Sequence, residues 1–464
     1  MSDQVVIIGG GLAGITAALR LADSGVDVVL LERRPRLGGA ASSFRRGDLT
    51  IDNGQHVFLR CCTAYRGLLD RIGATGDTTV QARLEIPVIA GPGWTAAAPG
   101  TVGMLKRTPG LPAPAHLLAA LARYRLLRPR DRLRVLRGAL GLRGLDLTDH
   151  SLDVETFGCF LRRHGQNDAT VAGLFDVVGT ATLNLPADRA SLALAAMVLR
   201  TGLLDDASAA DVGRAVVPLA RLHDDAAAAA LAAGGVAVRR RHRATALTAD
   251  GVLTVATASG ERYQLSGRRV ILAVPSAIAL QIAPFLAAVN GIDRLGHVPI
   301  VNVHVVYDRP VTDRQFAAAV GSPVQWVFDR TRASGLAERN HHAQYLAVTI
   351  SAAFTQVDQP TEVLREQFLP ALADLFPAAR SARVLDVFVT RERQATFCQA
   401  PGSGSARPGP RVCPSTAVLL AGAWTDTGWP DTMESAVRSG RAAADAVLGT
   451  EQEKGGDSEP DVDC

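Results

Sequence analysis

The first thirty residues carry a hydrophobic pattern that alternates between two kinds of element. Val5–Gly9 is an apolar run that predicts a buried strand, and Leu12–Ser24 has helical spacing up to Gly25. Val26–Glu32 is a second apolar run and predicts a second strand. A strand, a helix and a strand within about thirty residues match the size of a dinucleotide-binding unit.

Farther along the chain the pattern changes. Residues 110–205 are mainly helical in spacing, residues 216–290 are mixed, and residues 298–350 alternate apolar and polar positions as a half-buried sheet does. Leu419–Gly422 predicts a last buried strand and Thr432–Leu448 the last helix. The predicted fold class is α/β, with a Rossmann-like nucleotide-binding domain and an interleaved α+β domain that faces the substrate.

A chain of 464 residues exceeds one typical core, so we expect two domains that share several crossings of the chain. The residues from Thr450 onward are acidic and contain glycine, a composition typical of disorder. We therefore assign residues 1–90, 208–290 and 385–449 to the nucleotide-binding domain, 91–207 and 291–384 to the substrate domain, and 450–464 to a disordered acidic tail.

Composition narrows the class of protein. Hydrophobic residues make up 47% of the chain, yet no run of about 18 apolar residues predicts a transmembrane helix. The predicted strand at Val5 leaves no room for a signal peptide ahead of it, so we expect a cytoplasmic protein. The six cysteines contain no CxxC motif, which favours free thiols over disulfides or a metal site.

The net charge of +4 is spread unevenly, because arginine dominates between Lys106 and Arg143 among many leucines. One interpretation is a solvated helical face. The other is a membrane-facing amphipathic segment, in which arginine meets lipid phosphate and leucine enters the interface, at the inner face of the cell membrane. Nucleic acid is not an expected partner, because aromatic residues for base stacking are scarce there.

The turn after the first strand carries the first chemical motif. Gly9, Gly11 and Gly14 fit G-x-G-x-x-G, and Leu12 and Ala13 complete the turn into the helix. The glycines allow a tight turn, close approach of the backbone to a pyrophosphate, and close packing of helix on strand. Glu32 ends the second strand, where a carboxylate accepts hydrogen bonds from an adenosine ribose. An acid at this position favours FAD or NAD over NADP.

Two further segments extend the predicted cofactor site. The segment from Glu32 to Gly39 carries an acid, basic residues and a glycine pair, and it resembles the second flavin fingerprint of the amine oxidase and phytoene desaturase superfamily. Its predicted cofactor-binding residues are Arg33, Gly38, Gly39 and Ala40, and Ala40 stands where that family often has arginine. In Asn53, Gly54, Gln55 and His56, a glycine between two amides suits a backbone that passes close to a flat ring, so we expect these residues to line the flavin.

A last candidate segment lies near the end of the chain. Gly422 and Ala423 precede a loop rich in tryptophan and aspartate, and Asp431 with Glu434 has the spacing of a capping box. The predicted helix that follows starts at Thr432 and Met433, and its N-terminus would stabilise the anionic reduced flavin. The chain is thus predicted to begin and end on one non-covalently bound FAD, with Ala244 of the mixed segment as a further contact.

Seven segments spread along the chain share one further pattern: DNGQHVFLRCCTAY, TFGCFLRRHGQ, ATLNLP, VPLARLHDDAA, QWVFDR, RERQATF and AGAWTDTGWPDTMESAVRSGR. Through these segments the whole chain except its tail resembles the hydroxysqualene dehydroxylases, also described as squalene-associated FAD-dependent desaturases. The resemblance implies an amine oxidase-like FAD fold and an enzyme of squalene or hopanoid synthesis that acts on a C30 isoprenoid alcohol. Ala423 departs from the family, which usually has an acid there to bind the ribityl chain.

The implied reaction is reductive removal of an allylic hydroxyl from hydroxysqualene, which gives squalene. Such a reaction needs a positioned substrate, a dry apolar cavity and a proton for the leaving hydroxyl. His56 and Asp426 are the predicted catalytic acids, because both lie in motifs expected near the flavin ring. The donor that reduces FAD is not revealed by the sequence.

Three other functions stay open. A carotenoid-type or dehydrosqualene desaturase would use the same motifs with hydride transfer from substrate to FAD. An amine oxidase is disfavoured, because these enzymes usually place a lysine near flavin N5 and neither Lys106 nor Lys454 lies in a suitable strand. A non-catalytic prenyl-lipid carrier, as in the GDP-dissociation inhibitors, is favoured by Ala40 and Ala423 and opposed by the intact glycine loop and Glu32.

Overall fold

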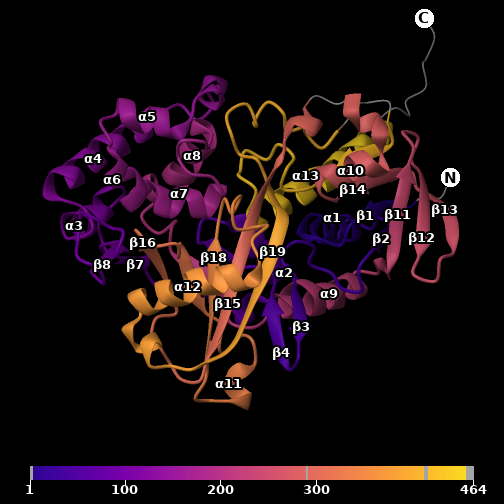
Figure 1. The fold of residues 1–464 in the computed structure, drawn as a ribbon. Coiled ribbons are helices and arrows are strands. Elements are labelled where there is room, and N and C mark those ends of the chain that lie inside the picture. Colours follow the sequence, from indigo (N-terminus) through magenta and orange to yellow (C-terminus); the bar gives the residue numbers. More distant parts are fainter. Residues whose placement is uncertain (1–3, 289–290, 412–415, 456–464) are drawn as a thin grey trace, which may run out of the picture.

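A five-stranded parallel sheet forms the centre of one half of the computed structural model, which describes residues 4–288, 291–411 and 416–455 (Figure 1). Its strands stand in the order β10-β2-β1-β14-β20, and all neighbours run parallel. Both predicted strands of the N-terminal unit are therefore present as central strands. The bounds are β10 (Ala237–Arg240), β2 (Val28–Glu32), β1 (Val5–Ile8), β14 (Arg269–Leu272) and β20 (Val418–Leu420).

Each face of this sheet has its own apolar core. Val5 and Ile7 of β1 pack with α1 (Leu12–Ala22) and α13 (Met433–Gly455), whereas Val6 and Ile8 belong to the core on the other face. This alternation is the two-residue period of a strand that is buried on both faces. The second face is covered by a three-stranded antiparallel sheet and a helix: β11 (His242–Leu247), β12 (Val252–Thr257), β13 (Arg262–Ser266) and α10 (Ser276–Ile282).

Helices α1 and α13 cross in close contact, and this crossing joins the two ends of the chain. A Cβ atom on Gly440 of α13 would lie 2.2 Å from the carbonyl oxygen of Ala13 in α1. Only glycine permits that approach. Smaller elements surround the pair: α2 (Thr63–Arg71), α9 (Ala227–Ala233), the hairpin β3 (Ser43–Arg46) and β4 (Leu49–Asp52), and the sheet β5 (Val57–Leu59), β9 (Val212–Ala215) and β6 (Thr78–Val80).

The second half contains a seven-stranded sheet with the order β19-β15-β18-β17-β16-β7-β8, in which only β16 and β7 pair in parallel. α12 (Thr361–Leu375) covers one face, where Phe368 and Leu372 pack on Val303 of β15. The bounds are β19 (Val384–Phe397), β15 (His297–Tyr307), β18 (Gln344–Ile350), β17 (Trp326–Asp329), β16 (Phe316–Val320), β7 (Glu85–Ala90) and β8 (Val102–Lys106), and α11 (Leu336–Arg339) lies at the far end of β18.

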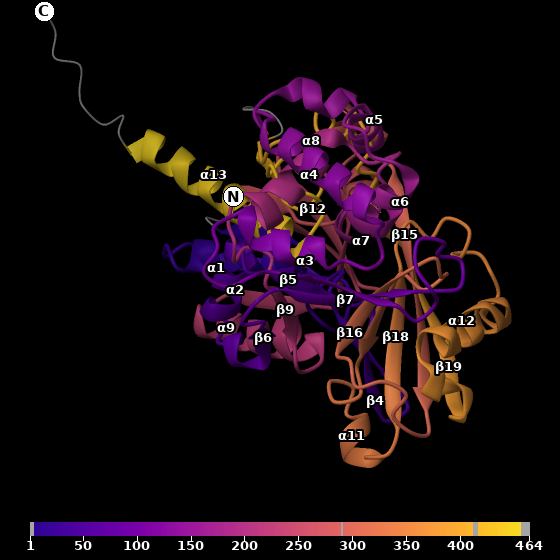
Figure 2. The ribbon, with the colours of Figure 1, turned by 90° about the vertical axis from the view of Figure 1, so that its left-hand side faces the viewer.

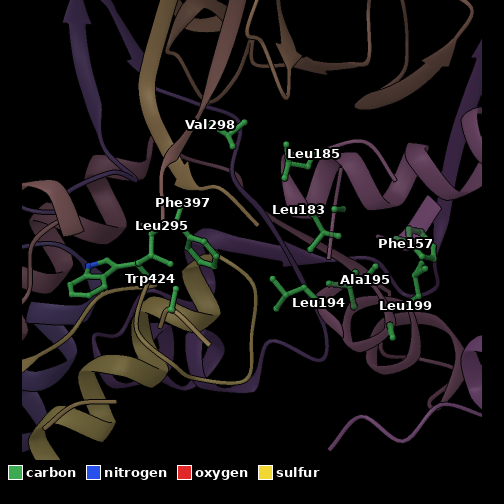
Figure 3. Packing of buried hydrophobic residues seen from close by; sticks show 14 of the residues in the cluster. Phe157, Leu183, Leu185, Leu194, Ala195, Leu199, Leu295, Val298, Phe397 and Trp424 are labelled. Carbon is green, nitrogen blue, oxygen red and sulfur yellow. The ribbon is translucent and has the colours of Figure 1, made fainter. Parts of the chain in front are cut away.

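A helical layer lies beside both sheets and faces the viewer in Figure 2. It consists of α3 (Leu118–Ala122), α4 (Pro129–Arg143), α5 (Phe157–Arg163), α6 (Asp168–Thr170), α7 (Asp176–Leu183) and α8 (Leu192–Leu199). Figure 3 shows part of the continuous apolar core that joins this layer to the C-terminal segments: Leu183 and Leu194 come from the layer, and Phe397 and Trp424 come from the other side.

The predicted α/β fold class is confirmed. The last helix starts one residue later than predicted, at Met433, and continues to Gly455 rather than ending at Leu448. Residues 456–464 of the predicted acidic tail lie outside the described residues. The division into two domains stays a prediction, although β7 and residues 385–397 of β19, assigned to the nucleotide-binding domain, pair within the seven-stranded sheet.

Two compositional expectations concern the described part of the chain. Cys61, Cys62, Cys159 and Cys398 are free thiols there. Within the same ranges, no helix has both the length and the apolar character that crossing a bilayer takes.

Candidate functional site

The candidate site lies at the carboxyl edge of the five-stranded sheet. Gly9 follows β1, Glu32 ends β2, Ala273 follows β14 and Ala421 follows β20. Because the strands are parallel, these segments from both ends of the chain meet at one edge. Ligands of open α/β sheets bind in the crevice at this edge.

The glycine turn has the geometry of a phosphate-binding loop. Gly9 has a φ of +109°, and a Cβ atom there would lie 2.2 Å from the carbonyl oxygen of Ala273. A Cβ on Gly14 would lie 1.9 Å from the carbonyl oxygen of Gly9, so neither position accepts a side chain. Gly11 precedes α1 and provides no side-chain cap, which leaves the N–H groups of the first turn, at Leu12, Ala13 and Gly14, to bind a pyrophosphate.

Glu32 joins this turn to the next segment. Its carboxylate accepts a hydrogen bond from the Gly10 N–H at 2.8 Å and another from the Arg34 N–H at 2.7 Å, and the residue is 6% exposed. Each carboxylate oxygen has a second lone pair available for a ribose hydroxyl. Arg33 itself points outward and is exposed.

The Gly38–Gly39 turn rests directly on the first glycine loop. The Gly38 N–H donates to the carbonyl oxygen of Gly10 at 2.8 Å, and Gly38 and Gly39 have φ values of +96° and +58°. A Cβ on Gly39 would lie 2.8 Å from the Cα of Gly11. The two fingerprints therefore form one continuous backbone cradle. Ala40 follows with an exposed side chain.

A buried histidine, His223, forms a hydrogen bond with the backbone directly after this second glycine turn. Nδ1 of His223 lies 2.8 Å from the carbonyl oxygen of Ala41, and Nε2 lies 2.8 Å from the hydroxyl of Tyr65. Because a carbonyl only accepts, Nδ1 carries the proton and the Tyr65 hydroxyl donates to Nε2. Burial lowers the pKa of His223 to about 4, so the ring is neutral at pH 7.

Asn53 connects the cradle to the seven-stranded sheet. Its side-chain nitrogen donates to the carbonyl oxygen of Ala40 at 2.7 Å and to Glu392 at 3.1 Å, and its side-chain oxygen accepts from the Ser42 N–H. Its own carbonyl oxygen accepts from Asn302 of β15 at 3.2 Å. The predicted flavin-lining segment is therefore anchored on both halves of the molecule.

Gln55 and His56 continue this segment beside a cavity of about 10 Å³, enough for roughly one water molecule. The side-chain nitrogen of Gln55 is buried and has no hydrogen-bond partner among the residues that the structure describes. The His56 ring lies against Gly54, where a Cβ would be 3.2 Å from Nε2. Burial, followed by the nearby guanidinium of Arg330, lowers the pKa of His56 to about 4, so His56 is neutral at pH 7.

The C-terminal loop forms the other wall of the site. Gly422 has a φ of +148°, and the indole N–H of Trp424 donates to the carbonyl oxygen of Val274, next to the residue that Gly9 touches. The carbonyl oxygen of Ala423 accepts from Ser435 at 3.0 Å and from Arg407 at 3.1 Å. These contacts hold the backbone of the loop at Ala423, whose side chain provides no hydrogen bond.

The predicted capping box is wrong. Thr432, immediately before Met433, accepts the N–H of Ser435 through its hydroxyl at 3.3 Å and so caps α13. Asp431 instead accepts the N–H of Phe397 at 2.8 Å. Glu434 accepts the N–H groups of Ala64 and Tyr65 at the start of α2. Both carboxylates therefore accept hydrogen bonds from backbone N–H groups that are distant in sequence.

Asp426 has a different environment from the other predicted catalytic residue. Its side chain is exposed, and its carboxylate accepts the N–H of Gly428 at 3.2 Å within its own loop. The structure brings most of the predicted residues to the sheet edge, whereas the carboxylate of Asp426 faces solvent.

The adenosine end of the predicted site opens into a pocket of about 620 Å³ beside Arg33 and Arg34. Arg241 and Arg243 at the start of β11 line its other wall, and Ala244 is buried next to them. The residues present fit FAD: Gly9 and Gly14 accept no Cβ atom, Glu32 retains free lone pairs, and within the described residues the buried Nε of Arg36 and side-chain nitrogen of Gln55 have no hydrogen-bond partner.

Sequence reasoning missed two ionisable groups beside the C-terminal loop, Arg407 and Asp431. Arg407 is 6% exposed and donates to the carbonyl oxygens of Ala423 and Thr425 at 3.1 and 2.5 Å, and burial lowers its pKa. It lies in a glycine- and proline-rich stretch that carries no recognised motif. Asp431 was assigned only a capping role, yet burial raises its pKa to about 6 against the opposing effects of the Phe397 N–H and Arg407.

Residues 12–448 match the family described as flavin-containing amine oxidoreductases. The hydroxysqualene dehydroxylase of Rhodopseudomonas palustris is 31% identical over 453 residues, covering 97% of this chain and 99% of that protein. The hydroxysqualene dehydroxylase of Zymomonas mobilis is 28% identical, with 95% and 98% covered. The zeta-carotene desaturase of Zea mays is 26% identical, with 97% and 84% covered.

Solved structures show the same fold. An oxidoreductase from Methanosarcina mazei superposes with a TM-score of 0.70 at 14% identity, covering 96% of this chain and 100% of that one. Cyclohexylamine oxidase from Brevibacterium oxydans superposes with a TM-score of 0.67 at 18% identity, with 97% and 100% covered. At these identities the likeness establishes the fold.

Proposed function

This chain belongs to the hydroxysqualene dehydroxylase family of flavin-containing amine oxidoreductases, and we propose that it removes the allylic hydroxyl of hydroxysqualene reductively to give squalene. FAD is the cofactor of this oxidoreductase. The observation that carries the proposal is the full-length likeness to several hydroxysqualene dehydroxylases, in a chain that retains the backbone cradle of the fold.

The residues of the chain would hold FAD along the carboxyl edge of the sheet. The cradle of Gly9, Gly11 and Gly14 would bind the pyrophosphate, Glu32 the ribose, and the loop after Gly422 the ring end. When bound, reduced FAD supplies the hydride for the carbon that loses oxygen.

An apolar core at the ring end supports a hydrocarbon substrate. Phe397 and Trp424 share one buried cluster with Leu183 and Leu194 of the helical layer (Figure 3). A site of this kind excludes water and strengthens charge stabilisation during C–O cleavage. Lys106, the lysine whose side chain is described, lies on β8 at the sheet edge opposite β19, so an amine-oxidase role gains no support from it.

The test is product analysis under anaerobic conditions. Protein reconstituted with FAD and chemically reduced is incubated with hydroxysqualene, and the extract is examined by mass spectrometry. Squalene in amounts that match the oxidised flavin supports the proposal. A flavin that stays reduced, with no squalene, contradicts it.

A desaturase is the second candidate, because zeta-carotene desaturases are 24–26% identical over nearly the whole chain. A desaturase would move hydride from substrate to oxidised FAD. Bleaching of the oxidised flavin by squalene under argon, with a conjugated C30 product, would favour this reaction over dehydroxylation.

We also propose that the protein draws its lipid substrate from the inner face of the cell membrane through a basic leucine patch. Leu133 and Leu140 of α4 are 68% and 66% exposed and stand seven residues apart, so they share one helix face. The remaining members are exposed leucines and arginines of the same segment: Leu111, Leu118, Arg123, Arg125, Arg128, Arg130, Arg137 and Arg143.

The arginine charges of the patch support binding to an anionic membrane. Among the described residues, none of the six patch arginines forms an ion pair, so their charges are available to anionic lipid headgroups, and the leucines would enter the interface. In flotation assays with anionic vesicles, replacing Leu133 and Leu140 by serine should release the protein. The matched control is serine at Val363 of α12, 44% exposed and outside the patch. Equal flotation of both variants would contradict the proposal.

A further inference from the structure

Asp431 occupies the junction between the loop that follows Gly422, the start of α13 and the end of β19. Its carboxylate oxygen Oδ2 accepts the N–H of Phe397 at 2.8 Å, and its own N–H donates to Oε1 of Gln399 at 3.0 Å. Thr432 caps the helix, so Asp431 is free of that role. Within the described residues, Oδ1 has no hydrogen bond. The carboxyl group is therefore held by one oxygen with the other available.

One side of Asp431 borders the apolar core. Phe397, which holds the carboxylate, is 2% exposed and belongs to the cluster of Figure 3 together with Leu295 and Trp424. The same cluster extends to Leu183 of the helical layer. Asp431 thus stands where the predicted flavin-ring loop meets the apolar core.

One charged group acts on Asp431 at close range. Arg407 lies across the Phe397 ring, 5.0 Å from its centroid, and its charge favours ionisation of Asp431. The charges of Asp426 and Asp153 also act on Arg407, which donates to the carbonyl oxygens of Ala423 and Thr425. Burial outweighs Arg407, and the pKa of Asp431 rises to about 6.

We propose that the carboxyl group of Asp431 is the proton donor that allows the allylic hydroxyl to leave as water. This assignment rests on the proposed dehydroxylation. The C–O bond breaks with its electron pair on oxygen, and that oxygen takes the Asp431 proton. The carbon gains a hydride with two electrons from reduced FAD, which is left oxidised. The Asp431 carboxylate then regains a proton from solvent, so atoms and electrons balance.

The two acids predicted from the sequence fit this step less well. His56 is neutral at pH 7, because its pKa is lowered to about 4, so its imidazolium form is scarce. Asp426 is exposed and bound to the N–H of Gly428. Asp431 is half-buried and combines a free carboxyl oxygen with a position at the predicted flavin loop.

The experiment measures the hydride step without an electron donor. FAD-loaded protein is reduced under argon and mixed with hydroxysqualene, and the return of the oxidised flavin spectrum gives the rate at several pH values. The variants are Asp431→Asn, which retains an acceptor for the Phe397 N–H, Asp431→Glu, which retains the acid, and Asp70→Asn, at an exposed residue of α2, as the matched control. The FAD dissociation constant of each variant separates loss of cofactor from loss of proton transfer.

The wild-type rate should fall about tenfold per pH unit above the pKa of Asp431, because only the protonated carboxyl donates. Asp431→Asn should slow the step by about 100-fold or more and remove this pH dependence, with little change in FAD affinity. Asp431→Glu should restore much of the rate with a shifted pH dependence, and Asp70→Asn should match the wild type.

Three results would overturn the assignment, and they can be distinguished. If wild-type flavin is reoxidised and Asp431→Asn shows the same rate and pH dependence, Asp431 is not the donor and dehydroxylation stands. If hydroxysqualene does not reoxidise even the wild-type flavin, the proposed function fails and the assignment fails with it. Should Asp431→Asn not retain FAD, an Asp431→Glu profile identical to that of the wild type would also contradict the proposal.

Discussion

Glu434 is the acid on which the docking of α2 against α13 depends. Its side chain is fully buried, and its carboxylate accepts the N–H groups of Ala64 at 3.1 Å and Tyr65 at 2.7 Å and the Nε–H of Arg438 at 2.8 Å. Cys62 at the start of α2 provides no side-chain cap, so Glu434 supplies one from the far end of the chain.

Replacing Glu434 by alanine removes this cap and leaves the Arg438 charge unpaired. Hydrogen bonds to a charged group contribute about 1.5–3 kcal/mol each, and the ion pair adds little beyond them because the Arg438 side chain is 36% exposed. Because these contributions overlap, we expect Glu434→Ala to lower the free energy of unfolding by about 3–5 kcal/mol. Glu434→Gln keeps one acceptor oxygen and should lose roughly half as much.

Urea unfolding followed by tryptophan fluorescence measures both effects. Glu366→Ala is the matched control, because Glu366 is exposed on α12, and such a change should stay within about 0.5 kcal/mol of the wild type. The reasoning would be refuted if Glu434→Ala stayed within about 1 kcal/mol of the wild type, or if alanine and glutamine destabilised the protein equally.

Three further predictions concern the cofactor site. Gly14→Ala should abolish FAD binding, because its Cβ would lie 1.9 Å from the Gly9 carbonyl oxygen. The control Gly76→Ala should bind FAD normally, because a Cβ at that position meets no atom within 4 Å. Fluorescence titration with FAD compares the two variants, and tight binding by Gly14→Ala would contradict the cradle geometry. Ala423→Asp should lower the FAD dissociation constant about fivefold, because one regained hydrogen bond contributes about 1 kcal/mol. An unchanged dissociation constant in the same titration would show that backbone contacts already compensate for the missing carboxylate. The folded-state pKa of Asp431 is raised to about 6, so its contribution to stability is present below about pH 4 and is lost as the pH rises through 6. In FAD-free protein, Asp431→Asn should therefore gain stability relative to the wild type between pH 4 and pH 7, by at most about 3 kcal/mol. If the urea midpoints of the variant and the wild type differ by the same amount at every pH, the pKa of Asp431 is not raised.

The parts of the fold that short-range patterns specify were predicted well. The apolar run at Val5 became β1, and the helix predicted over Leu12–Ser24 was found over Leu12–Ala22. Hydrophobic period and glycine sterics act over a few residues, so the sequence alone carries them. The meeting of Gly9 with the loop after Gly422 also followed, because parallel strands must end at one edge of the sheet.

Contacts between distant segments were beyond local rules. Asp431 and Glu434 have capping-box spacing, but the free N–H of Phe397 and the start of α2 take these acids in the folded protein. Arg407 lies in a segment without periodicity, so nothing in the sequence indicated that it would be buried beneath Ala423. The position of β7 in the seven-stranded sheet likewise depends on pairing with β16, more than 200 residues later.

The central claim, that hydride passes from reduced FAD to the carbon that loses oxygen, is tested most directly by isotope transfer. The hydrogen on N5 of reduced flavin exchanges with solvent, so enzyme reduced in D2O and mixed there with hydroxysqualene would deliver deuterium. The account predicts squalene with a single deuterium at the former carbinol carbon. Squalene without deuterium at that carbon, or a conjugated product from oxidised enzyme alone, would contradict it.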